Sequence, residues 1–159
     1  MSGRKSSASD SLAMRPFARS LPMQLLRARE ALMQQFRPHL RARGLSEQQW
    51  RVVRALVETG SMEINALGEA CQIHPASLSR MLPNLEKEGR IERRADTDDQ
   101  RYTIVSITAK GRTLFERVAK ESEEIYRAIE RRIGSHDVKL LYDLLDKTIR
   151  AAPAVSSRE

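Results

Sequence analysis

The stretch INALGEACQIHPASLSRMLPNLEKEGRIERRADTDDQRYTIVSI, residues 64–107, decides the fold that we predict for this chain. Apolar residues recur at helical spacing in its first half, and turn-forming residues interrupt them. Proline suits the first turn of a helix and glycine suits its end, so Pro75 and Gly89 mark the two ends of one helix. The stretch therefore predicts a short helix over 64–71, a turn over 72–74 and a second helix from Pro75 to Gly89.

The second predicted helix has an apolar face and a polar face. Its leucines fall at i, i+4 and i+7, so we expect these three residues to point into the core: Leu78, Leu82 and Leu85. The polar residues off this stripe must face outward, and they are Ser77, Ser79, Arg80 and Asn84. Pro83 departs from the pattern, because proline removes a backbone N–H and crowds the preceding turn. We expect the helix to bend there or to shorten after Leu82.

Two segments with strand character follow this helix. They are Ile91–Ala95 and Tyr102–Ile107, and the polar run Asp96–Arg101 between them is typical of a hairpin loop. A short helix, a tight turn, a second helix and a hairpin, in this order, are the parts of a winged helix-turn-helix. We therefore predict a mainly α fold with a small β wing, of a kind that reads DNA.

Helices are predicted on the N-terminal side of this head as well. Apolar residues at helical spacing indicate a helix over 21–40, and we expect Pro38 to kink it or to end it. Ser46 and Gln49 have the spacing of a capping box, which starts a further helix that runs to about Val57.

On the C-terminal side, Thr108 is the predicted N-cap of a long helix that Gly134 ends, and Ser135 is the predicted cap of the last helix. The terminal helices carry more apolar surface than one small head can cover, so they predict a homodimer. The chain then divides into a disordered basic tail over 1–14, helical dimerisation segments over 15–44 and 108–151, a winged helix-turn-helix over 45–107, and a disordered tail over 152–159.

The charge of the chain is unevenly distributed. The formal net charge is +7, and residues 1–43 carry nine basic and two acidic residues, which equals the entire excess. Residues 74–101 hold six basic and six acidic residues, so the predicted reading head is neutral overall. Its affinity for DNA must therefore depend on where individual charges lie, while the N-terminal segment supplies the general attraction to nucleic acid.

Several classes of protein are excluded by composition. No apolar run approaches the roughly 20 residues that span a membrane, and the N-terminus lacks the apolar centre of a secretory signal. Cys71 is the single cysteine, which excludes an internal disulfide and favours a reducing, cytoplasmic location. We find no phosphate-binding glycine loop, no metal-ligand cluster and no nucleophile motif, so we predict no catalytic residues, metal or cofactor.

Six short motifs carry a resemblance to a known family. In order they are Leu67–Ala70, Ser77–Arg80, Leu85–Gly89, Arg93–Arg94, Asp96-x-x-Asp99-x-Arg101 and Ile107-Thr108-x-Lys110-Gly111. At this spacing they resemble the signature of the MarR family of bacterial regulators. The phrases RSLPMQLLRAREALMQQFRPHL, LSEQQWRVVRAL and IYRAIERRIG are similar to one branch of that family, the homoprotocatechuate degradation operon repressors.

The resemblance implies a homodimer that binds double-stranded DNA at a palindromic operator. It also implies repression of an aromatic-acid catabolic operon until a small aromatic carboxylate loosens the grip on DNA. A hydroxyphenylacetate or homoprotocatechuate-like acid fits the branch, and a hydroxynicotinate-like acid fits related regulators.

The resemblance assigns the outward face of the second helix to the major groove, where bases show distinct donors and acceptors. Arg80 is the candidate for a guanine edge or a nearby phosphate, and Ser77 and Ser79 are short donors that allow close approach. Asn84 lies on the same face, after Pro83. The positions that match family contacts near the DNA backbone are His74 and Pro75.

In the wing, Arg101 is expected to enter the minor groove, where the negative potential attracts it. Asp99, two residues earlier, can pair with the guanidinium and fix its direction. Arg93 and Arg94 are the candidate phosphate contacts, which add affinity without specificity.

The ligand pocket that the resemblance implies lies near the first and second helices. A carboxylate needs a cation, and we expect Arg27 or Arg29 to supply it. The ring needs an apolar or aromatic wall, which Trp50 can provide, and His39 can hydrogen-bond a ring hydroxyl.

Two other functions remain open from the sequence. One is a redox-sensing repressor that uses Cys71, although a lone cysteine on an apolar helix face is more often inert core. The other is an architectural nucleic-acid-binding protein, which would show little preference for one DNA sequence over another.

Overall fold

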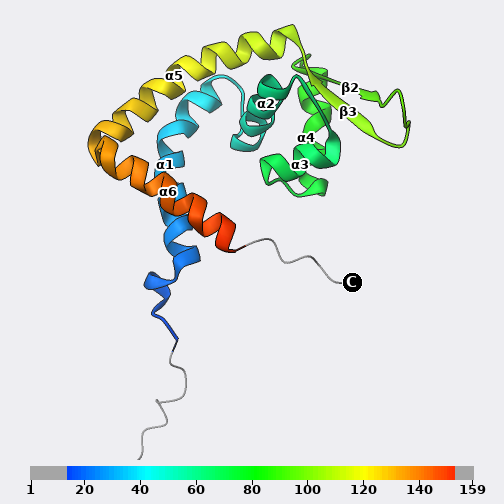
Figure 1. Cartoon of the computed structure of the whole chain (residues 1–159). Coiled ribbons are helices and arrows are strands. Elements are labelled where there is room, and N and C mark those ends of the chain that lie inside the picture. Colours follow the sequence, from blue (N-terminus) through cyan, green and yellow to red (C-terminus); the bar gives the residue numbers. More distant parts are fainter. Residues whose placement is uncertain (1–13, 153–159) are drawn as a thin grey trace, which may run out of the picture. The chain divides into compact units, whose positions relative to one another are not determined.

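The computed structural model describes residues 14–152 of the chain, which are mainly helical with one small antiparallel sheet (Figure 1). The described elements are η1 (Phe17–Arg19), α1 (Leu21–Ala42), α2 (Glu47–Thr59), β1 (Ser61–Glu63), α3 (Ile64–Cys71), α4 (Pro75–Lys87), β2 (Ile91–Ala95), β3 (Thr103–Ile107), α5 (Ala109–Ile133) and α6 (Ser135–Ala151). The chain divides into two compact units, Met1–Gln35 and Phe36–Glu159. Nearly all of the two tails that we predicted to be disordered lies outside the described residues.

Helix α1 begins as predicted, with Pro22 in its first turn, where a missing N–H leaves no helical bond unmade. It continues past Pro38 and ends at Ala42. The helix therefore does not end at this proline, which was one of the two predicted outcomes. Phe36 and Leu40, on either side of Pro38, are both buried. Their burial holds the last turns of the helix although one backbone hydrogen bond is missing.

Helix α2 starts at the capping box that the sequence predicts. The Ser46 side chain accepts the backbone N–H of Gln49 at 3.1 Å, and the Gln49 side chain accepts the N–H of Ser46 at 2.8 Å. The inner face of the helix buries an aromatic and three aliphatic side chains: Trp50, Val52, Val53 and Leu56. This helix is the centre of the core of the head.

The turn between α3 and α4 depends on close backbone packing. Gln72 has a left-handed conformation with φ of 51°, and the N–H of Ile73 donates to the Gly68 carbonyl oxygen at 2.9 Å. A Cβ on Gly68 would lie 3.3 Å from the Ile73 carbonyl oxygen and from Leu78, so glycine lets α3 approach the start of α4. The prediction of two helices joined by this turn is confirmed.

Helix α4 runs from Pro75 to Lys87 with Pro83 inside it, so of the two predicted outcomes, a bend or a shortening after Leu82, the shortening is excluded. Leu82 and Leu85, on either side of Pro83, are completely buried. Their contacts with the core hold the helix across the missing hydrogen bond. The N–H of Glu88 donates to the Asn84 carbonyl oxygen at 3.0 Å, which shows that the last turn is formed.

The sheet has the strand order β1-β3-β2, and both pairs are antiparallel. The predicted hairpin is formed by β2 and β3, with Ile91 opposite Ile107 and Arg93 opposite Val105. Strand β1 was not predicted, because three residues directly after a helix are too few to show a strand pattern. It adds a third strand to the base of the wing, while the β2–β3 loop extends beyond the helices (Figure 1).

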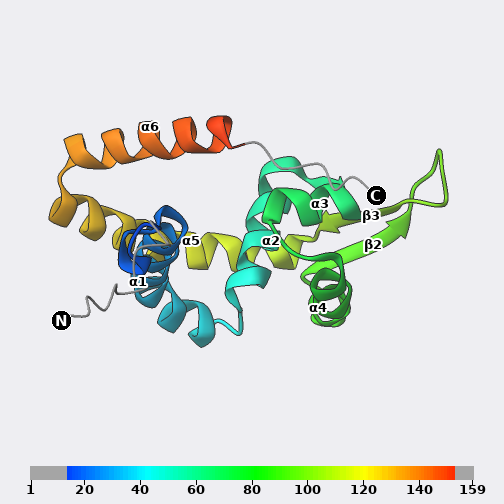
Figure 2. The same ribbon diagram turned by 90° about the horizontal axis from the view of Figure 1, so that it is seen from below.

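The two C-terminal helices differ in how they begin. The Thr108 hydroxyl accepts the N–H of Gly111 at 3.0 Å, so Thr108 is the N-cap of α5 as predicted. The N-cap of α6 is Gly134 instead, and Ser135 is the first helical residue and makes no capping bond, so that prediction is wrong. At Gly134 the chain reverses between α5 and α6 (Figure 2).

No helix among residues 14–152 is long and apolar enough to cross a membrane.

Candidate nucleic-acid interface

The start of α4 is fixed by its own side chains. His74 is the N-cap, and its Nδ1 accepts the backbone N–H of Ala76 at 3.3 Å. Pro75 follows at the first helical position, where its fixed φ favours the helix. Both residues are exposed. The capping role of His74 was not predicted, because histidine is not among the usual N-cap residues.

The outward face of α4 carries the predicted polar residues. Ser79, Arg80 and Asn84 are exposed and Ser77 is half-buried. The Nε of Arg80 donates to the Ala76 carbonyl oxygen at 3.2 Å, which directs the guanidinium along the helix surface. This face therefore offers hydroxyl, amide and guanidinium groups on a rigid helix, as base recognition in a major groove requires.

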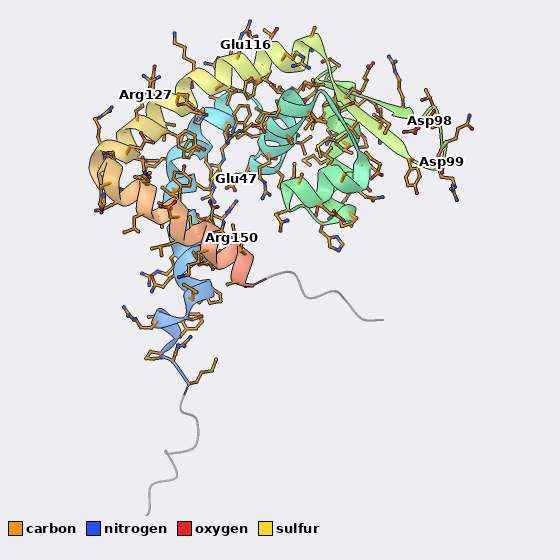
Figure 3. The ribbon with its side chains drawn as sticks, in the orientation of Figure 1. Glu47, Asp98, Asp99, Glu116, Arg127 and Arg150 are labelled. Atoms are coloured by element: carbon orange, nitrogen blue, oxygen red, sulfur yellow. The ribbon has the colours of Figure 1, made fainter. Side chains whose placement is uncertain are left out.

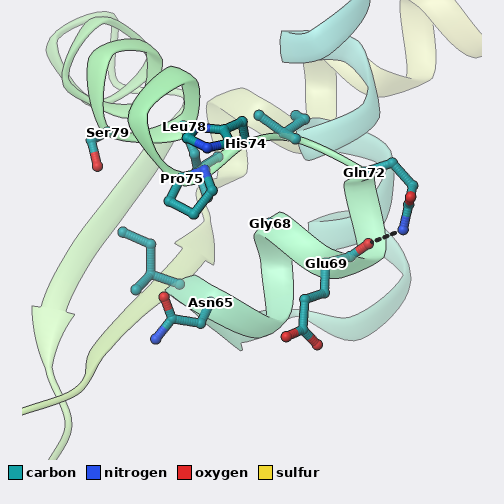
Figure 4. Close-up of a pocket in the computed structure, with 10 residues that line it drawn as sticks. Asn65, Gly68, Glu69, Gln72, His74, Pro75, Leu78 and Ser79 are labelled. Atoms are coloured by element: carbon teal, nitrogen blue, oxygen red, sulfur yellow. Dashed lines mark hydrogen bonds between the residues drawn. The ribbon is translucent and has the colours of Figure 1, made fainter. Parts of the chain in front are cut away.

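An open groove of about 650 Å³ lies between α3 and the start of α4 (Figure 4). Its apolar lining comes from residues such as Ile64, Ile73 and Leu78, and its polar residues include Asn65 and Ser79. Asn65 was not among the predicted site residues. Its place in the first turn of the predicted helix was the feature of the sequence that could have identified it. The backbone N–H groups of Asn65 and Ala66 donate to the Glu63 carboxylate at 2.9 and 3.1 Å, so this helix start is already capped by an acidic side chain.

The tip of the wing is ordered by its acidic residues. The Asp96 carboxylate accepts the N–H groups of Asp98 and Asp99 at 2.7 and 3.2 Å, which closes the turn. Figure 3 shows Asp98 and Asp99 at the tip of the wing, away from the helices. The acids at the tip therefore shape the loop and do not merely solvate it.

Asp99 also holds Arg101, as the sequence predicted. Its carboxylate accepts the backbone N–H of Arg101 at 3.0 Å, the Nε at 3.0 Å and the Nη2 at 2.6 Å. The hydrogen bonds from Arg101 hold the pKa of the Asp99 carboxyl below its usual range, so the carboxylate is charged at neutral pH. The Arg101 side chain nevertheless remains 84% exposed, so it is oriented and still accessible.

Arg93 and Arg94 follow each other in β2 but have different partners. The Arg93 guanidinium makes two hydrogen bonds to Glu86 of α4, whereas Arg94 pairs with Glu92 of its own strand at 2.9 Å. The Arg94 side chain is 75% exposed and the Arg93 side chain is 31% exposed. The two neighbours that were predicted to share one role therefore differ in their surroundings.

The candidate ligand residues fall in both units. Arg27 and Arg29 lie on α1 in the unit Met1–Gln35 and are exposed. Trp50 is buried in the second unit and stacks on Phe115 of α5, with ring centroids 5.5 Å apart. His39, also in the second unit, has its Nε2 3.0 Å from the Ser122 hydroxyl oxygen. Burial lowers the pKa of this histidine, so it favours the neutral form, which can both donate and accept a hydrogen bond.

Two residues that were not predicted, Arg54 and Tyr126, contact each other beside these aromatic side chains. Arg54 lies one helical turn after Trp50 in α2, and its Nη1 donates to the Tyr126 hydroxyl at 3.4 Å. Tyr126 in turn contacts Phe36, with ring centroids 4.8 Å apart. The i, i+4 spacing of Trp50 and Arg54 was a signal in the sequence, but Tyr126 enters only through tertiary packing.

Cys71 is buried in α3, and burial raises the pKa of its thiol. A buried thiol with a raised pKa forms little thiolate at neutral pH and reacts slowly with oxidants. Among residues 14–152, no group of three or more His, Cys, Asp or Glu residues could hold a metal ion.

The two-helix unit, the exposed polar face of α4 and the arginine-bearing wing define a winged helix-turn-helix DNA-binding protein. Comparisons with known proteins agree. Residues 45–103 match the model of the MarR family. The chain is 39% identical over 139 residues to the HTH-type transcriptional regulator FarR of Neisseria gonorrhoeae, which covers 87% of this chain and 94% of that protein.

Two more relatives extend the match. The chain is 40% identical over 131 residues to the homoprotocatechuate degradative operon repressor of Escherichia coli, covering 82% of this chain and 88% of the repressor. It superposes on the crystal structure of NadR in complex with 4-hydroxyphenylacetate with a TM-score of 0.74 and 37% identity, covering 86% and 97% of the two chains. The chain belongs to the MarR family of DNA-binding transcriptional regulators, which are not enzymes.

Proposed function

We propose that this regulator is a homodimeric repressor of an aromatic-acid catabolic operon and that a small aromatic carboxylate releases it from DNA. The inducer would be a hydroxyphenylacetate or homoprotocatechuate-like acid, or a hydroxynicotinate-like acid. The main support is the likeness, over most of the chain, to a homoprotocatechuate operon repressor and to NadR with 4-hydroxyphenylacetate bound. Such a repressor would act in the cytoplasm, on a palindromic operator.

In this proposal α4 reads the major groove and the wing enters the minor groove. Arg80 contacts a base edge or phosphate, and Arg101, directed by Asp99, enters the minor groove. The remaining DNA contacts of α4 and β2 are His74, Pro75, Ser77, Ser79, Asn84 and Arg94. Arg93 differs from these residues because Glu86 already binds its guanidinium.

The homodimer is supported by the surface of α6. This helix has no buried residue, although it carries a run of large apolar side chains that stay exposed: Leu140, Leu141, Tyr142, Leu144 and Ile149. Exposed apolar area of this kind marks an interaction surface. A second copy of the chain would cover it, and a two-fold symmetric dimer would match a palindromic operator.

The effector site would use the cluster around Trp50. The ring of an aromatic acid would pack beside Trp50 and its neighbours, His39 would bind a ring hydroxyl, and a cation would bind the carboxylate. Arg54 is a candidate for this cation in addition to Arg27 and Arg29, because it lies on the same face of α2 as Trp50 and already binds a hydroxyl group. A redox-sensing role for Cys71 has less support, since its thiol is buried.

The test is operator binding with and without an effector. Footprinting on the DNA upstream of the gene for this chain should show a protected palindrome, and 4-hydroxyphenylacetate should reduce that protection. An architectural protein would protect unrelated DNA equally well. Protection that responds to peroxide, and not to any aromatic acid, would contradict the proposed effector.

A further inference from the structure

We propose that Glu86 and Arg93 form a clamp that sets the position of the wing relative to the recognition helix α4. In this proposal Arg93 is a positioning residue and does not contact a DNA phosphate. The inference rests on the proposed DNA-binding role of α4 and the wing, and it assigns to Glu86 a function that the sequence did not suggest.

The clamp is made of three hydrogen bonds between two elements. Glu86, in the last turns of α4, accepts the backbone N–H of Arg93 at 3.0 Å with Oε1. Its Oε2 accepts the Nε of Arg93 at 3.0 Å and the Nη2 at 2.7 Å. One carboxylate thus binds both the main chain and the side chain of a residue in the middle of β2, which fixes the strand in direction as well as distance.

The sheet explains why the backbone N–H of Arg93 is available. Strand β2 is at the edge of the sheet, and Arg93 lies opposite Val105 of β3. Because its N–H donates to Glu86, this residue pair is one in which the backbone groups point away from the neighbouring strand. Glu86 accepts a backbone N–H at the edge of the sheet that would otherwise need a water molecule as its partner. The same bond ties the recognition helix to the wing.

Charge explains why a clamped Arg93 is a poor phosphate ligand. The hydrogen bonds from Arg93 hold the pKa of the Glu86 carboxyl below its usual range, so Glu86 is charged at neutral pH. Glu86 partly neutralises the Arg93 guanidinium and takes two of its donors, and the Arg93 side chain is only 31% exposed, against 84% for Arg101, whose carboxylate partner leaves it accessible. Arg94, which points to the more exposed surface and pairs only within its own strand, does not link two elements and is the matched control.

The clamp matters for function because the two DNA contacts are far apart in the chain. Arg80 of α4 and Arg101 of the wing must reach neighbouring grooves at the same time. Arg101 lies eight residues beyond Arg93, so a small rotation of β2 displaces the tip by a larger amount. Fixing the strand against α4 removes this freedom before DNA binds, which lowers the entropic cost of binding.

The test uses an operator duplex selected by the protein from a random-sequence library. Fluorescence anisotropy at several salt concentrations would give the affinity and its salt slope for the wild type, Glu86→Gln, Arg93→Gln, Arg93→Lys and Arg94→Gln. Circular dichroism at the assay temperature would verify that each variant is folded. A scrambled duplex of equal composition would measure non-specific binding.

If the clamp positions the wing, Glu86→Gln, Arg93→Gln and Arg93→Lys each weaken binding about ten-fold and change the salt slope by the same amount, because each displaces the same wing, whereas Arg94→Gln lowers the slope by about one. Arg93→Lys is the decisive variant. Lysine keeps a positive charge that can bind a phosphate, but it cannot make the paired hydrogen bonds from Nε and Nη2 to Glu86. Adding Arg101→Ala to Glu86→Gln should cost little more than Arg101→Ala alone, since a displaced wing no longer uses Arg101 fully.

Three results would overturn the clamp. One is tighter binding by Glu86→Gln together with a lower salt slope in Arg93→Gln, which would identify Arg93 as a phosphate contact. The others are wild-type affinity in Arg93→Lys and unchanged affinity in all the clamp variants. A wild-type protein that does not distinguish the selected duplex from the scrambled one would instead refute site-specific DNA binding itself, and the clamp with it.

Discussion

The winged helix-turn-helix head and the last helix, α6, have similar apolar content but opposite surroundings. In the head, Val53, Leu56, Leu67, Leu82 and Leu85 are completely buried. In α6, Leu140, Leu141, Leu144 and Ile149 are exposed, the last of them by 70%. The head closes its own core within one chain, whereas α6 has an apolar face that only another surface can cover. The closed core and the exposed apolar face therefore lie in different parts of the molecule.

The largest effect should follow from Leu82→Ala in the core of the head. A buried leucine replaced by alanine leaves a cavity and lowers the free energy of unfolding by about 2–5 kcal/mol. Leu144→Ala in α6 is the matched variant, and at protein concentrations too low for dimers it should change that free energy little. Urea unfolding over a range of protein concentrations makes the comparison. An equal loss in both variants at low concentration would mean that α6 is packed within the single chain.

Gly111→Ala should have the next largest effect, because it lies where the head meets α5. A Cβ at this position would be 2.2 Å from the Arg90 carbonyl oxygen and 2.5 Å from Ile107, so backbone must shift. Overpacking of this kind costs about 1–3 kcal/mol. Thr113→Ala, on the exposed side of the same helix, is the control for a general effect on α5. A thermal melt of Gly111→Ala that equals that of the wild type would contradict this close packing.

A smaller effect should come from the helix caps. Ser46→Ala removes a capping box at the start of α2 and should cost about 1 kcal/mol. Ser135→Ala, at the start of α6, should cost almost nothing because Ser135 makes no capping bond. Denaturant midpoints of the two variants measure the contrast. Equal midpoints in the two variants would contradict the prediction, because they would mean that Ser135 stabilises α6 as strongly as Ser46 stabilises α2.

The smallest effect concerns pH and the tip of the wing. Since Arg101 lowers the folded pKa of Asp99, their pair contributes stability above the unfolded pKa of the carboxyl and loses it as pH falls through the lowered folded pKa. Arg101→Gln should therefore raise the pKa of Asp99 toward its usual range. Carboxyl chemical shifts followed by NMR would show this, with Glu86 as an internal reference that the substitution should not move. An unshifted Asp99 would mean that the pair is not formed in solution.

Most of the head could be predicted from residues close together in sequence. The capping box at Ser46, the two-helix spacing around Pro75 and the hairpin each depend on local geometry, and each is confirmed. The pairing of Asp99 with Arg101 is equally local, since the two residues are neighbours in one loop. Neither helix ends early at its proline, which was one of the two outcomes predicted at Pro38 and at Pro83, because local rules count the lost hydrogen bond but not the burial of the apolar side chains around it.

The sequence by itself determined the order of the α-helices and of the two hairpin strands, the caps at Ser46 and Thr108, and the family, because these follow from short spacings and from motifs. Only the tertiary structure decided which arginine remains accessible. Arg93 and Arg94 are chemically identical neighbours, but α4 places Glu86 beside Arg93 alone. The contact between Arg54 and Tyr126 likewise depends on packing between distant segments, which no local pattern encodes.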